Sequence, residues 1–133
     1  MRRVLATWAA LGLLLALPAL AAPCGANLPA KNKQVIEQDG VTLAFAPRKA
    51  ALGIGRPFAL DIAVCPAPRS IAVDADMPAH RHGMNYKPSV TATGKGRYVA
   101  DGLLLHMPGH WRFIFDLDLN GKPLRLTREL DVQ

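Results

Sequence analysis

The segment WRFIFDLDLNGKPLRLTRELDV, residues 111–132, decides the fold class. Apolar and charged residues mostly alternate through its first half, and a second alternating run covers residues 124–132. Such alternation is typical of a β-strand with one buried face, because successive side chains point to opposite sides. The Asn-Gly pair at 120–121 separates the two runs, and this arrangement predicts a tight β-hairpin.

Five shorter runs upstream have the same period of two, and Gly- or Pro-containing segments separate them. The predicted strands cover residues 41–46, 58–65, 71–76, 89–93 and 97–101. No segment has a helical period over ten residues. Seven short strands with frequent turn signals predict an all-β protein, specifically an immunoglobulin-like β-sandwich of about seven strands. A β-barrel of similar strand number is the alternative fold.

The N-terminus has the pattern of a signal peptide covering residues 1–21. Arg2 and Arg3 precede an apolar run over residues 4–17, and Pro18-Ala19-Leu20-Ala21 offers a cleavage site with small residues. The apolar run is shorter than the roughly 20 residues that span a bilayer. We therefore expect cleavage near Ala21, no stable membrane insertion afterwards, and a periplasmic location. An uncleaved membrane anchor is the alternative.

After the signal peptide we expect an irregular N-terminal segment, residues 22–40, and one β-sandwich domain, residues 41–133. Cys24 and Cys65 are the only cysteines of the chain. In an exported protein an even cysteine count favours a structural disulfide. The alternative is a cysteine that binds copper or haem. The chain has no Cys-x-x-Cys-His motif, and no His or Met closely follows Cys65, so the disulfide is favoured.

The charge of the chain argues against a nucleic-acid-binding protein. The formal net charge is +6, but the Lys and Arg residues are scattered and never form a block of four. A nucleic acid or an anionic membrane surface would require a concentrated basic patch. No nucleophile–base pair and no pair of catalytic carboxylates stands out either. We therefore expect a protein that is not an enzyme.

Histidine and methionine are concentrated in one part of the chain. All four histidines and the three methionines other than Met1 lie between positions 77 and 110, in the clusters MPAHRHGM at 77–84 and HMPGHW at 106–111. Thioether sulfur prefers Cu(I), and imidazole binds both copper states. Zinc sites rarely use methionine. The mixture therefore predicts a copper site, with Cu(I) favoured.

The candidate ligands come from both clusters. His80, His82 and Met84 alternate, so an extended chain places all three on one face. The second cluster offers His106 and Met107, which are adjacent and therefore point to opposite faces of a strand. The sequence leaves open which of these two completes the site.

Two other residues of the clusters are expected to lie outside the metal site. Met77 continues the inward alternation that begins at Ile71, so a core position is favoured for it. His110 beside Trp111 is expected to be an exposed turn residue. Met107 follows Leu103 and Leu105 at intervals of two residues, so it would share their face of a strand. For Met107, core packing is therefore as well supported as metal ligation.

The motifs at 77–84 and 107–111 together resemble the YtkA-like domain family, which is related to FixH-like proteins. The resemblance covers residues 56–119 and implies a secreted immunoglobulin-like sandwich associated with copper handling or cytochrome oxidase assembly. The positions that match the family pattern are His80, His82, Met84 and Met107. A weaker likeness is to periplasmic copper chaperones of cytochrome oxidase assembly, whose His and Met ligands come in two groups about twenty residues apart. The present chain departs from them because His106 and Met107 have no residue between them.

The sequence thus predicts a periplasmic copper-binding protein, a carrier or metallochaperone whose partner is a cytochrome oxidase or copper-transport component. The alternative from another class is an interaction module that docks on a membrane complex without a metal. An oxidase that uses copper for redox catalysis is a third hypothesis, and no substrate pocket is apparent in the sequence to support it.

Overall fold

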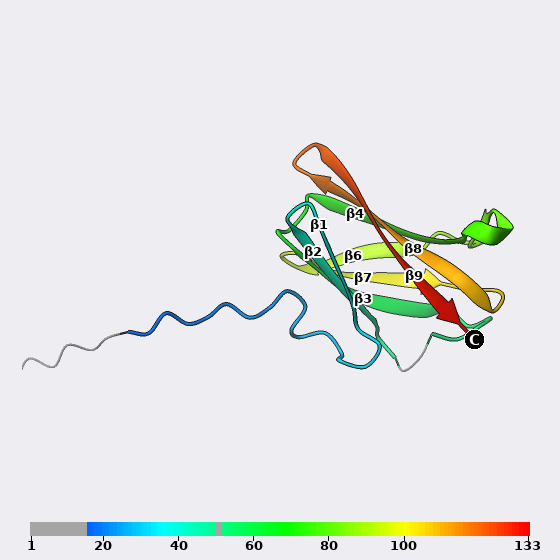
Figure 1. Cartoon of the computed structure of the whole chain (residues 1–133), viewed down its shortest axis with the longest axis horizontal. Helices are drawn as coiled ribbons and strands as arrows, with labels where there is room; N and C mark the ends of the chain where they lie inside the picture. Colours follow the sequence, from blue (N-terminus) through cyan, green and yellow to red (C-terminus); the bar gives the residue numbers. More distant parts are fainter. Residues whose placement is uncertain (1–15, 50–51) are drawn as a thin grey trace, which may run out of the picture.

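The computed structural model describes residues 16–49 and 52–133. This part of the chain forms nine strands and one short 3-10 turn, arranged as two antiparallel sheets that face each other (Figure 1). The elements are β1 (Gln34–Gln38), β2 (Val41–Pro47), β3 (Phe58–Cys65), β4 (Ser70–Met77), η1 (Pro78–His80), β5 (His82–Gly83), β6 (Ser89–Gly94), β7 (Arg97–Leu103), β8 (Gly109–Leu119) and β9 (Lys122–Val132). The predicted all-β sandwich is confirmed.

The two sheets have the strand orders β1-β2-β3-β7-β6 and β5-β4-β8-β9. The described residues form nine strands, whereas the sequence predicted about seven. The two strands that were not predicted are β1 and β5. β1 lies inside residues 22–40, so the prediction of an irregular segment there is wrong for Gln34–Gln38. Asp39 and Gly40 both have positive φ, 52° and 77°, and this tight turn folds β1 back onto β2.

The β8–β9 hairpin has the predicted turn. Asn120 and Gly121 have φ values of 55° and 88°, and Leu119 pairs with Lys122 directly before and after them. Asn and Gly tolerate this left-handed conformation better than other residues, which is why the pair fixes the register of the longest hairpin.

The core lies between the two sheets and is built on aromatic residues. Trp111, Phe113 and Phe115 of β8 are completely buried, as the alternation predicts. Phe45 of β2 reaches them from the other sheet, with ring centroids 5.8 Å from Phe113 and 4.9 Å from Phe115. The charged positions of β8 lie on the opposite face, where Arg112 binds the Asp76 carboxylate with contacts of 2.9 Å and 2.6 Å.

The predicted disulfide joins Cys24 to Cys65, with a Cα–Cα distance of 6.0 Å. It ties the N-terminal segment to the outer face of the five-stranded sheet. Gly25 lies so close to this face that a side chain there would clash with the Cβ of Ala44. Ala44 and Ala63 are therefore buried, although the alternation of their strands points them away from the core.

Residues 1–15 of the predicted signal peptide lie outside the described residues. In the described part of the chain no helix is long and apolar enough to span a bilayer.

Candidate metal centre

His82 is positioned by a tight reversal of the chain after β4. Arg81, with φ of 55°, closes the turn by donating its backbone N–H to the Pro78 carbonyl at 3.3 Å. β5 then returns beside β4, so that His82 lies directly opposite Met77. Residues paired in this way point to the same face of a sheet. His82 therefore shares the inner face with the buried Met77 and is itself half-buried.

His106 comes from the connection between β7 and β8. The residue before it, Leu105, is completely buried and forms a bridge with Ile54. The Leu105 carbonyl also accepts a hydrogen bond of 2.8 Å from the Gly55 N–H. This anchored backbone places the exposed His106 side chain beside that of His82 in β5.

Three histidines gather at this end, and His82 is the central one. Its ring centroid lies 5.0 Å from that of His106 and 5.6 Å from that of His80. The indole of Trp111 packs against two of these rings. Its ring centroid lies 5.5 Å from that of His106 and 6.4 Å from that of His82. Trp111 in turn is fixed by its Nε1, which donates to the Met107 carbonyl at 3.0 Å.

The Nδ1 atom of His82 is buried and has no hydrogen-bond partner among the described residues. A buried polar atom left unpaired costs about 1–3 kcal/mol, so it is normally satisfied by a partner, a water or a ligand. Two imidazoles that bind one tetrahedral ion at about 2.0–2.1 Å have ring centroids about 5 Å apart. The spacing of His82 and His106 fits such a shared ion.

Imidazole, thiol and carboxylate ligands alone do not make a complete site here. Across residues 16–49 and 52–133, no group of three or more His, Cys, Asp or Glu side chains is placed to hold a metal ion. A site at His82 and His106 therefore requires ligands of another kind. The thioethers of Met84 and Met107 are the candidates that the sequence indicated.

Both of these methionines are partly buried and pack against the core at the margin of the sandwich. The backbone N–H of Met84 donates to the Ala75 carbonyl at 3.1 Å, which holds the residue beside the end of β4. Met77, by contrast, is 1% exposed and belongs to the core, as predicted. The structure thus brings His80, His82 and His106 together, whereas Met84 and Met107 pack against the core.

His110 differs from the expected turn residue, because it lies in β8, where it pairs with Asp131 of β9. Its Nδ1 lies 2.8 Å from the Asp131 carboxylate, and its Nε2 lies 2.9 Å from that of Glu129. These hydrogen bonds, the one to Glu129 above all, raise the pKa of His110 above 6.5. With both ring nitrogens bound to carboxylates, His110 has no free nitrogen for a metal.

Sequence reasoning missed the role of Trp111 as the support of the histidine pair. The sequence signal was its position as the last residue of the second cluster, where it begins the alternating run of β8. The alternation of apolar and charged residues places Trp111 on one face of a strand, but it does not show that the indole packs against two imidazoles.

No protein-family model matches the chain, and no curated protein is detectably similar to it. Among solved structures, the chain is similar to a DUF4426 family protein from Pseudomonas aeruginosa PAO1. That crystal structure has 6% sequence identity and a TM-score of 0.56, and the similarity covers 78% of this chain and 97% of the other. At this identity the similarity supports the fold alone. The resemblance to the YtkA-like family stays a prediction.

Proposed function

We propose that this protein binds copper at one end of its β-sandwich and acts as a carrier or metallochaperone rather than as an enzyme. One observation carries the proposal. The rings of His82 and His106 lie at the spacing expected for a shared ion, and the buried Nδ1 of His82 has no hydrogen-bond partner among the described residues. A metal ion would supply the missing partner.

The choice of copper follows from ligand chemistry. Two imidazoles and a thioether form a soft set, which favours Cu(I) over harder divalent ions. In our assignment His82 and His106 bind the ion and Met84 or Met107 completes the site, while His80 lies beside His82, with ring centroids 5.6 Å apart. The side chains of His80 and His106 are exposed, which suits an ion that has to be passed to another protein.

The proposed compartment is the periplasm, and the proposed partner is a copper-transport or cytochrome oxidase component. The Cys24–Cys65 disulfide supports an oxidising compartment, because such bonds persist outside the reducing cytoplasm.

The test is a copper titration of the folded mature protein in competition with a colorimetric Cu(I) chelator. We expect one copper per chain, and at least about a hundredfold weaker binding in the double variant His82→Ala/His106→Ala, which loses two coordinate bonds. His110→Ala is the matched control, since both nitrogens of that histidine are already occupied. Equal affinity in the parent and the double variant would reject the site. No copper binding by the parent, together with lower stability of the double variant, would favour the interaction module.

A further inference from the structure

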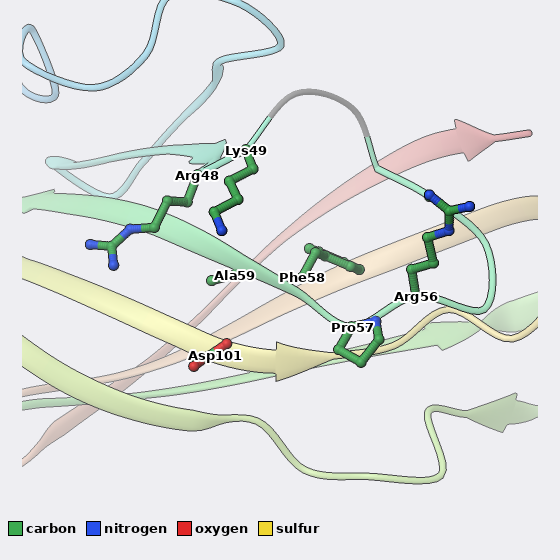
Figure 2. Close-up of a pocket in the computed structure, with 8 residues that line it drawn as sticks. Arg48, Lys49, Arg56, Pro57, Phe58, Ala59 and Asp101 are labelled. Atoms are coloured by element: carbon green, nitrogen blue, oxygen red, sulfur yellow. The ribbon is translucent and has the colours of Figure 1, made fainter.

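A cationic groove lies where the chain passes from β2 to β3. Its volume is about 590 Å³, within the range of sites that take a ligand of drug size or a short peptide segment. Figure 2 shows Arg48 and Lys49 on one side, Arg56 on the other, Phe58 between them, and Ala59 below Lys49. Charged side walls and an apolar floor make this an amphipathic groove.

The positive charge of the groove is only partly compensated. Arg48 forms an ion pair of 3.0 Å with Asp61, yet its side chain stays 50% exposed. Lys49 and Arg56 form no ion pair with any carboxylate of the described residues. Asp101 is the acidic residue of the lining. Two or three cations are therefore available to an anionic ligand.

The groove is connected to the histidine pair through the backbone. Gly55, next to Arg56, donates its N–H to the carbonyl of Leu105 at 2.8 Å, and Leu105 directly precedes His106. Ile54 forms a bridge with the same leucine. A molecule held in the groove would lie beside the end of the sandwich that carries His106.

We propose that the groove docks an acidic segment of a partner protein, with an apolar side chain of that segment on Phe58 and its carboxylates on Lys49 and Arg56. Complementary charge raises the rate of encounter and fixes the orientation of a protein complex. The apolar floor favours a peptide over a bare anion, because an inorganic ion would leave Phe58 uncovered. The purpose of docking, copper exchange at His106, rests on the proposed function, but the binding itself does not.

The test is an NMR titration of the 15N-labelled mature protein with the peptide Glu-Glu-Leu-Glu-Glu, in the presence of a metal chelator. We expect amide shifts at Arg48, Lys49, Arg56 and Phe58, and at least about tenfold weaker binding of the neutral peptide Gln-Gln-Leu-Gln-Gln. Equal binding of the two peptides would overturn the proposal. The same shifts with inorganic phosphate alone, or binding to anionic phospholipid vesicles without peptide binding, would also overturn it.

Charge-reversal variants distinguish peptide binding in the groove from a general effect of the protein's net charge. Arg56→Glu should weaken binding of the acidic peptide about tenfold, whereas Lys95→Glu in the β6–β7 turn, which changes the net charge equally, should leave it within about twofold. Equal losses in both variants would show a non-specific charge effect and reject the groove. Because the titration is metal-free, its outcome is independent of the copper titration, and either proposal can fail alone.

Discussion

The imidazole rings of His82 and His106 lie 5.0 Å apart, centroid to centroid, although one belongs to β5 and the other to the β7–β8 connection. Two separate backbone constraints create this pairing. The pairing of β5 with β4 fixes His82 opposite Met77, and the hydrogen bond between Gly55 and Leu105 fixes the backbone before His106. The two rings are therefore held close before any ion arrives, which lowers the entropic cost of binding one.

If both rings bind the same ion, their nitrogens are coordinated together. We expect the electron paramagnetic resonance spectrum of the Cu(II)-loaded protein to show coupling to two imidazole nitrogens. His82→Ala and His106→Ala should each reduce this to one, whereas His110→Ala should keep two. Two nitrogens remaining in His106→Ala would assign the second position to His80, whose ring also lies beside that of His82 at 5.6 Å.

Trp111 supports both the core and the histidine pair. It is completely buried, and Trp111→Ala should lower the free energy of unfolding by about 3–5 kcal/mol, as truncation of a buried aromatic residue does. Trp111→Phe should cost less, since it keeps an aromatic ring in the core and loses only part of the ring volume together with the hydrogen bond to the Met107 carbonyl. Chemical denaturation measures both variants. A loss below about 1 kcal/mol for Trp111→Ala would contradict its position in the core.

The fold was predictable because its information is local. Alternation along residues 111–132 fixes which side of β8 and β9 is buried, and the Asn120–Gly121 pair fixes their register. β1 was missed because its short run, Gln34–Gln38, is mostly polar and only Ile36 is buried. Its place depends on pairing with β2, which the sequence of β1 alone does not encode.

The candidate site was predictable only in its chemistry. Clustering of histidine and methionine indicated copper, and the alternation of His80, His82 and Met84 indicated a common face. Two other relationships depend on contacts between distant segments. The packing of His106 against His82 depends on the β7–β8 connection. The cationic groove brings together Arg48 and Arg56, which are separated in the sequence. The scattered distribution of basic residues along the chain therefore did not indicate a cationic site.

His110 should titrate above the ordinary histidine range, because Glu129 and Asp131 stabilise its protonated form and raise its pKa. Since the folded-state pKa exceeds the unfolded one, the stabilisation is fully present below about pH 6.5 and is lost as the pH rises through the folded-state pKa. The stability difference between the parent and His110→Gln should therefore be larger at about pH 5.5 than at about pH 9. An NMR titration gives the pKa directly, and Glu129→Gln should lower it. An unchanged pKa in that variant would contradict the hydrogen bond as its main cause.

The Cys24–Cys65 disulfide closes a loop with a sequence separation of 41 and anchors the N-terminal segment on the sheet. Its removal in Cys24→Ala/Cys65→Ala should cost about 3–4 kcal/mol in the loop-entropy description. For a domain of this size we expect Tm to fall by about 10–20 °C. The native protein should show no reactive thiol until it is denatured and reduced. Two reactive thiols in the native protein would contradict the bond.

If a methionine is a ligand, its removal should change the affinity for Cu(I) more than the affinity for Cu(II). A thioether stabilises Cu(I) far more than Cu(II), whereas an imidazole binds both. Met84→Leu keeps the apolar packing of a partly buried side chain and removes the sulfur, so it should weaken Cu(I) binding about tenfold or more and leave Cu(II) binding nearly unchanged. His82→Ala should weaken both. Chelator competition under reducing and oxidising conditions measures the two affinities.

Met77→Leu is the matched control for Met84→Leu, because it makes the same exchange at a core position. Met77 is 1% exposed and lies opposite His82. A volume-conserving exchange of this kind usually costs less than about 1.5 kcal/mol, so the fold should persist. Cu(I) affinity should remain at the parental level, since a buried thioether that packs against the core is not a ligand. If Met84→Leu behaves like Met77→Leu, Met84 is a packing residue. The same measurement on Met107→Leu then decides whether Met107 supplies the thioether, and unchanged Cu(I) affinity there as well would reject thioether ligation and with it the preference for Cu(I).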